Sequence, residues 1–101
     1  MSTDISLEFR RRAEKALEGR LDKIVLFGSR ARGDEMPDSD WDFAVFLKGR
    51  LVEGDRFKLS GVAYDLLLET GQFIQPVLLS GERESEDSLL MRNIRSEGRL
   101  V

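Results

Sequence analysis

Two short stretches hold the side chains best suited to chemistry. The first is a turn, Gly28-Ser29-Arg30-Ala31-Arg32, that follows an apolar run. A strand that ends in Gly28-Ser29 and turns into a short helix exposes backbone N–H groups, which bind phosphate oxygens. Arg30 or Arg32 can neutralise phosphate charge. This stretch also fits an ordinary strand-to-helix turn with surface arginines, and a Gly-Ser pair by itself favours that simpler interpretation.

The second stretch is Asp40-Trp41-Asp42, at the start of an expected strand. Because Asp40 and Asp42 are two residues apart, their side chains point to the same face, roughly 7 Å apart along the strand. Carboxylates at that spacing can share one Mg²⁺ or hold two. Aspartate is disfavoured inside strands, so the pair needs a reason, although a polar loop that merely precedes the strand explains it about as well. The opposite face carries the expected core residues Trp41, Phe43, Val45 and Leu47.

The composition narrows the chemistry that is available. The chain has 101 residues, 41% hydrophobic and 35% charged, which suits one domain over residues 1–101. It has no cysteine and no histidine, so any metal must be held by oxygen and no imidazole can act as a base. The net charge of -3 argues against nucleic-acid binding. Since no apolar run approaches the roughly 20 residues of a membrane span and no signal peptide is visible, we expect a cytoplasmic protein.

The elements that must position these residues follow from the apolar spacing. The expected order is α-β-(short α)-β-α-β-α: a helix from Ile5 closed by Gly19, a strand over 23–27, the short helix, a strand over 41–47, a helix from Asp55 to Gly71, a strand over 73–79, and a helix capped by Ser85 and ending at Gly98. Pro76 favours an edge position or a bulge for the third strand. This pattern predicts an α+β fold with a small mixed sheet and helices packed on one face.

Together the two stretches resemble the signature of a known superfamily. Gly28-Ser29-Arg30-Ala31-Arg32-Gly33-Asp34 followed by Ser39-Asp40-Trp41-Asp42 is similar to the motif of the DNA polymerase β-like nucleotidyltransferases, and within them to the minimal nucleotidyltransferases. Many of those are encoded beside a small helical HEPN-type toxin. The ending Asn93-Ile94-Arg95-Ser96-Glu97-Gly98 also looks like that of related domains. The resemblance implies the polymerase β palm-like fold.

The resemblance also implies a reaction and a role for each motif residue. An acceptor hydroxyl attacks the α-phosphorus of a nucleoside triphosphate, ATP by family default, and pyrophosphate leaves. Gly28 and Ser29 would hold the β- and γ-phosphates, with Arg32 assisting. Asp40 and Asp42 would be the catalytic residues and would hold one or two Mg²⁺ ions. Ser39 and Asp34 are expected to shape the turn. The expected acceptor is a HEPN-type protein partner, and a homodimer stays open.

The sequence departs from the family pattern at one position. A third carboxylate is expected on the third strand, where this chain has Gln75, whose amide carries no charge and cannot act as a base near neutral pH. Three explanations follow: a weak or inactive transferase that acts as a nucleotide-binding antitoxin, a substitute carboxylate, or activation of the acceptor by metal with a base from the partner or solvent. The candidate substitutes are Glu69, Glu82 and Glu84.

Overall fold

The computed structural model describes residues 4–101, apart from the side chain of Glu84. Its elements keep the expected order and add two short ones near the C-terminal end, η1 and β4. They are α1 (Ile5–Leu17), β1 (Leu21–Phe27), α2 (Ser29–Arg32), β2 (Trp41–Leu47), α3 (Asp55–Thr70), β3 (Ile74–Ser80), the 3-10 helix η1 (Gly81–Ser85), α4 (Leu89–Glu97) and β4 (Arg99–Leu100).

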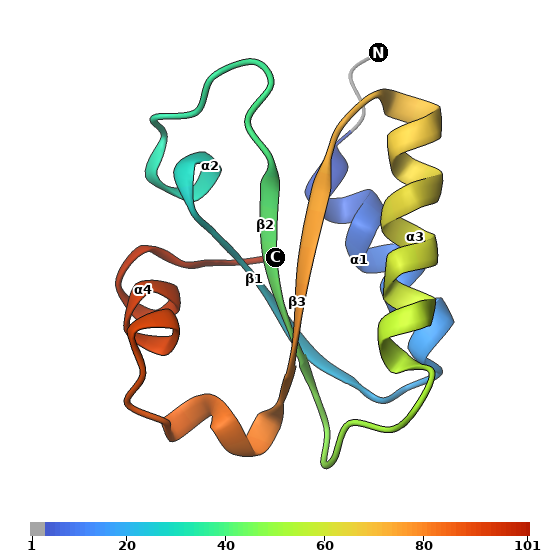
Figure 1. The fold of residues 1–101 in the computed structure, drawn as a ribbon, viewed down its shortest axis with the longest axis vertical. Helices are drawn as coiled ribbons and strands as arrows, with labels where there is room; N and C mark the ends of the chain where they lie inside the picture. The colour runs from blue at the N-terminus through green and yellow to red at the C-terminus, as the bar shows by residue number, and fades with distance from the viewer. Residues whose placement is uncertain (1–3) are drawn as a thin grey trace.

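The strands form one mixed sheet in the order β3-β2-β1-β4 (Figure 1). The strands β1 and β2 pair antiparallel, β2 and β3 pair parallel, and β4 pairs antiparallel with β1. The mixed sheet and the α+β class are therefore as predicted. Pro76 lies in β3, an edge strand of the sheet. An edge strand pairs with a neighbour on one side only, so the N–H that proline lacks costs the sheet less there than in a central strand.

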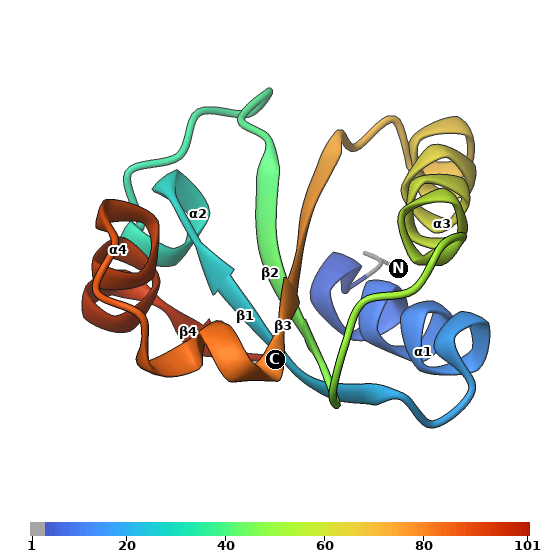
Figure 2. The ribbon, with the colours of Figure 1, turned by 60° about the horizontal axis from the view of Figure 1, so that its bottom comes forward.

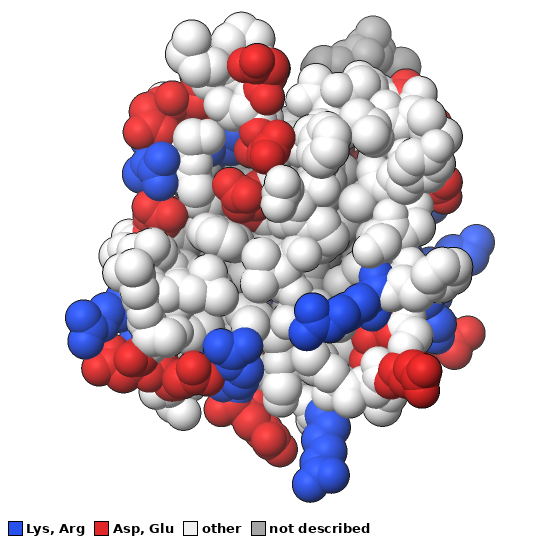
Figure 3. All heavy atoms as spheres, in the orientation of Figure 1, with Lys and Arg blue, Asp and Glu red and all other residues white. Residues whose placement is uncertain are grey.

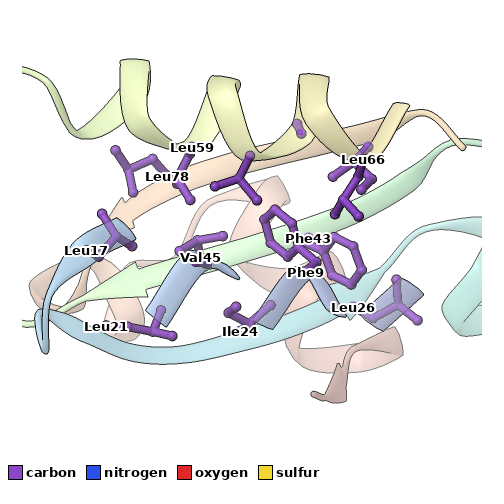
Figure 4. Close-up of a cluster of buried hydrophobic side chains, with 14 of the residues drawn as sticks. Phe9, Leu17, Leu21, Ile24, Leu26, Phe43, Val45, Leu59, Leu66 and Leu78 are labelled. Atoms are coloured by element: carbon purple, nitrogen blue, oxygen red, sulfur yellow. The ribbon is translucent and has the colours of Figure 1, made fainter. Parts of the chain in front are cut away.

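One face of the sheet packs on α1 and α3. Phe9 of α1 stacks on Phe43 of β2 with ring centroids 4.7 Å apart, and Leu59 and Leu66 of α3 close the cluster from above (Figure 4). These side chains are almost fully buried. At about 25 cal/mol per Å² of apolar surface, this cluster is the main source of stability.

The other face is covered by α4. Figure 2 shows the sheet between α1 and α3 on one side and α4 on the other. Met91 and Ile94 of α4 pack on Ala44 and Phe46 of β2 and on Leu79 of β3. The prediction of helices on one face is correct for α1 and α3 and incomplete for α4. The reason is that β2 is a central strand, and residues 43–47 are buried on both of its faces.

Local capping shifts several predicted boundaries. The cap of the last helix is Ser88, whose hydroxyl accepts from Met91 N–H, and not Ser85, which lies in η1. The end of α1 is formed by Glu18 in the left-handed conformation at φ 51°, one residue before the predicted Gly19. The strand β4 has two residues, too few for a pattern. Within residues 4–101, none of the helices combines the length and apolarity needed to cross a membrane.

Candidate functional site

Strand pairing brings the turn and the aspartates together. Phe27, the last residue of β1, is the antiparallel partner of Asp42 near the start of β2. Gly28 therefore lies directly against Asp42, and a Cβ built on Gly28 would be 2.3 Å from Asp42 Oδ2. Gly28 also has φ 79° and ψ -162°, a conformation open essentially only to glycine. The site thus requires glycine here twice, for backbone shape and for space.

Asp40 and Gln75 meet at the same corner of the sheet. Gln75 on β3 is in register with Asp42 on β2, so the two side chains share a face. The Gln75 amide nitrogen donates to Asp40 Oδ2 at 3.2 Å. The structure therefore brings Asp40, Asp42 and Gln75 to one corner. Figure 3 shows acidic groups gathered on this part of the surface, beside α2 and the start of β2.

The electrostatics of this corner favour a cation. The pKa of Asp42 is raised above its usual range, first by burial and then by the negative charge of Asp40. A divalent ion between the two carboxylates would offset both the burial of the Asp42 charge and its repulsion by Asp40. The residues present therefore fit an oxygen-ligated Mg²⁺. In the described part of the chain, no set of three or more carboxylates could hold a metal ion. Asp40 and Asp42, with the amide of Gln75, are thus the ligand set that the corner offers.

The two arginines of the turn have different surroundings. Arg30 donates to the backbone carbonyls of Ser39 at 3.0 Å and Pro37 at 3.3 Å, and its guanidinium stacks on the Trp41 ring at 4.2 Å. These contacts tie down the loop that leads to Asp40. Arg32 instead lies close enough to Asp42 to oppose the rise in its pKa. Of the two arginines predicted to bind phosphate, Arg32 acts on the charge of Asp42, whereas Arg30 is engaged with the loop and with Trp41.

The loop before β2 is shaped by Ser39, as expected. Its hydroxyl accepts from Met36 N–H at 2.8 Å, while Asp34 accepts from the side chain of Arg32 at 3.2 Å. The helix α2 has only four residues, so its dipole adds little to anion binding, less than the sequence suggested. Within the turn, Ala31 and Arg32 donate their N–H groups back to the Gly28 carbonyl, so the candidate backbone donors to an anion are the N–H groups of Gly28 and Ser29.

Glu97, which the sequence analysis did not assign to the site, contacts the phosphate turn directly. Its Oε1 accepts from Gly28 N–H at 3.0 Å and its Oε2 from Arg32 Nη1 at 3.0 Å. Arg32 and then the Gly28 N–H lower the pKa of Glu97, so the carboxylate is ionised at neutral pH. The available signal was the family-like ending at residues 93–98, in which Glu97 is the acidic member.

The substitute carboxylates suggested by the sequence lie elsewhere. Glu69 accepts two hydrogen bonds from Arg12 and joins α3 to α1. Glu82 is exposed in η1, beyond Ser80 at the far end of β3, which at about 3.3 Å per residue is about 17 Å from Gln75 along the strand. The side chain of Glu84 lies outside the described residues. Neither Glu69 nor Glu82 therefore supplies the third carboxylate.

Replacing Gly28 with alanine should damage both fold and site. The new Cβ would overlap Asp42, and the backbone conformation is one that alanine avoids, so we expect a loss of about 2–4 kcal/mol of stability. Urea unfolding measures the difference in the free energy of unfolding between Gly28→Ala and the wild type. Gly61→Ala in α3 is the matched control: its Cβ meets nothing within 4 Å, and in a helix it should stabilise by up to about 1 kcal/mol. Equal stability of Gly28→Ala and the wild type would contradict the close contact with Asp42.

Comparison with known proteins shows which family the chain belongs to. Residues 13–101 match the family "Polymerase beta, Nucleotidyltransferase". The chain is 31% identical over 75 residues to MJ0141 of Methanocaldococcus jannaschii, a protein named as a protein adenylyltransferase, and the match covers 74% of this chain and 76% of the relative.

Two solved structures share the fold. A toxin–antitoxin complex with AMP-PNP matches with a TM-score of 0.60 and 25% identity, covering 89% of this chain and 69% of that one. An MNT antitoxin in complex with the tri-AMPylated HEPN toxin of Shewanella oneidensis matches with a TM-score of 0.50 and 20% identity, covering 91% of this chain and 70% of that one. By its sequence match and its fold, the chain belongs to the polymerase β nucleotidyltransferase family.

Proposed function

We propose that this protein binds ATP with Mg²⁺ and transfers AMP to a hydroxyl group of a partner protein. The observation that carries the proposal is the contact between Gly28 and Asp42. It sets the hydrogen-bond donors of the turn directly against the carboxylate pair, as a site for a metal–triphosphate complex requires. The family supports the general activity, a nucleotidyl transfer.

Each part of the site would have a separate task. The N–H groups of Gly28 and Ser29, the Ser29 hydroxyl and the Arg32 guanidinium would bind and orient the phosphates. Asp40 and Asp42 would hold Mg²⁺, which when bound neutralises charge on the phosphates. Gln75 orients Asp40 through their hydrogen bond. Because its amide cannot take a proton near neutral pH, the proton of the acceptor hydroxyl would leave to solvent or to a group of the partner.

The comparisons support the choice of AMP and of a protein acceptor. The relative MJ0141 is named for protein adenylyl transfer, and the structures that share the fold include one with AMP-PNP and one with an AMPylated HEPN toxin. We therefore propose a helical HEPN-type protein as the partner.

Label transfer tests the activity. The protein is incubated with Mg²⁺, a HEPN-type protein as the candidate partner, and ATP labelled at either the α- or the γ-phosphate. We expect the α label, and not the γ label, on the partner, and we expect Asp40→Ala to reduce the transfer at least about 100-fold because a metal ligand is lost. Transfer of the γ label, or equal transfer by Asp40→Ala, would reject AMP transfer at this site.

A second function is favoured by one observation. Where the family pattern has a third carboxylate, Gln75 donates its amide to Asp40, which is a stable arrangement without any third charge. This suits an antitoxin that binds nucleotide and neutralises its partner by contact alone. If Asp40→Ala and Asp42→Ala neutralise the partner as fully as the wild type and no label is transferred, contact is the mechanism.

A further inference from the structure

A carboxylate occupies two of the donors that a phosphate would need. The two oxygens of Glu97 accept from Gly28 N–H and from Arg32 Nη1, each at 3.0 Å. A carboxylate and a phosphate present the same kind of charged acceptor, and Arg binds either through paired oxygens. Glu97 therefore makes the contacts expected of a phosphate oxygen pair in this turn.

The position of Glu97 follows from the packing of α4. Glu97 is the last residue of α4, and Gly98 follows it without room for a side chain, since a Cβ there would lie 2.4 Å from Val25 of β1. The next residues, Arg99 and Leu100, pair with β1 as β4. The end of α4 is thus pressed against β1, and the Glu97 carboxylate, whose side chain is 19% exposed, is directed to the turn at the end of that strand.

The charge of Glu97 also reaches the carboxylate pair. It is among the groups that raise the pKa of Asp42, which means that its negative charge is felt at Asp42. A triphosphate bound to both donors would have to displace the carboxylate from them. The bond from Arg32 would add most to the cost, because a hydrogen bond between two charged groups is stronger than one between neutral groups.

We propose that Glu97 is a built-in competitor for the triphosphate, which must leave the Gly28 N–H and Arg32 before the phosphates can bind there. This inference rests on the proposed nucleotide site. Glu97 would weaken the binding of every nucleotide, and only a ligand with several phosphate groups and a bound cation would displace it readily. Glu97 would therefore favour a metal-bound triphosphate over a monophosphate.

A plain structural role for Glu97 makes the opposite prediction. If the carboxylate only holds Gly28 and Arg32 in the shape that binds phosphate, its loss should weaken nucleotide binding. If it competes, its loss should strengthen that binding even though the fold loses two hydrogen bonds, one of which is the ion pair with Arg32. The sign of the change in affinity therefore separates the two roles.

Calorimetric titration with AMP-PNP and Mg²⁺ measures this sign. We expect Glu97→Gln, which keeps the size and removes the charge, to bind about tenfold more tightly than the wild type, and Glu97→Ala to do likewise. The melting temperature of the ligand-free variants should fall slightly in the same samples. Glu86→Gln is the matched control, because Glu86 pairs with Arg83 before α4 and should leave the affinity unchanged.

A double-mutant cycle localises the effect. In an Arg32→Ala background one of the two contested donors is gone, so the gain from Glu97→Gln should shrink. Equal or weaker binding by Glu97→Gln, with the wild type binding well, would overturn the competitor and leave the nucleotide site intact. If neither the wild type nor Glu97→Gln binds AMP-PNP, both the proposed nucleotide site and the proposed competition by Glu97 are rejected. A full gain that persists without Arg32 would also contradict the proposal.

Discussion

Asp42→Asn is expected to reduce binding of Mg²⁺ and AMP-PNP at least about 100-fold while raising the melting temperature at pH 7. The loss follows because an amide in place of a central carboxylate weakens a metal held by only two carboxylates. The gain in stability follows from the surroundings of Asp42: burial and the charge of Asp40 raise its pKa, so the ionised group is costly in the folded protein.

The direction of the pH dependence follows from that shift. A carboxyl group whose folded pKa lies above its unfolded value stabilises the fold below the unfolded pKa, and this contribution is lost as pH rises through the folded pKa. The neutral amide of Asp42→Asn avoids this loss of stability at high pH. The melting temperature of Asp42→Asn should therefore exceed that of the wild type at pH 7, and the difference should disappear below about pH 3.8, the ordinary pKa of aspartate.

Thermal unfolding at pH 7 and pH 3, beside calorimetric titration, measures both effects. Asp38→Asn is the control, since Asp38 is exposed in the same loop and should change neither quantity by much. A lower melting temperature for Asp42→Asn than for the wild type at pH 7 would contradict the inference that the ionised Asp42 destabilises the fold. Unchanged nucleotide binding would contradict the assignment of Asp42 to the metal.

Asp55→Ala is expected to cost about 3 kcal/mol of stability, the range for breaking a buried ion pair. Asp55 is 1% exposed at the start of α3. It accepts from Arg20 at 2.5 and 3.0 Å and from Val52 N–H at 2.7 Å. Without the carboxylate, the guanidinium and the N–H lose their partner and the loop before α3 loses its anchor.

Thermal unfolding measures this loss as a fall in melting temperature of about 12–24 °C, on the scale for a domain of this size. Arg20 and then the Val52 N–H are the favourable contacts that lower the pKa of Asp55, so its contribution is present above the unfolded pKa and is lost as pH falls through the folded one. The difference in melting temperature between the wild type and Asp55→Ala should therefore shrink in acid. Asp65→Ala, an exposed aspartate on the same helix, is the control. A fall of less than about 3 °C would show that the buried pair contributes little.

Much of the fold and part of the site were readable from local pattern. Strand β2 has the predicted limits, residues 41–47, because the change from aspartate to an apolar run marks its start and Gly49 follows its end. Gly71 ends α3 as predicted, since its φ of 75° favours glycine. Side chains alternate along a strand, so parity placed Phe43 and Val45 in the core opposite Asp42.

What pattern could not supply is the pairing between distant segments. The face covered by α4 was missed because Phe46 lies on the same side as Asp42, and only the packing of Met91 and Ile94 shows why that side is apolar further along the strand. The contacts of Arg30 with the loop and of Glu97 with Gly28 join residues whose relation depends on how the chain folds back. No spacing in the sequence encodes them.

The sequence by itself determined the chemistry: glycine, serine and arginine at a strand end, two aspartates two residues apart, and no histidine or cysteine. Those properties are local, because residue type and strand alternation decide which atoms can bind phosphate or Mg²⁺. Tertiary structure alone decided how the site is completed. The antiparallel register of β1 and β2 sets Gly28 against Asp42, and the docking of α4 brings Glu97, 69 residues along the chain from Gly28, onto the same turn.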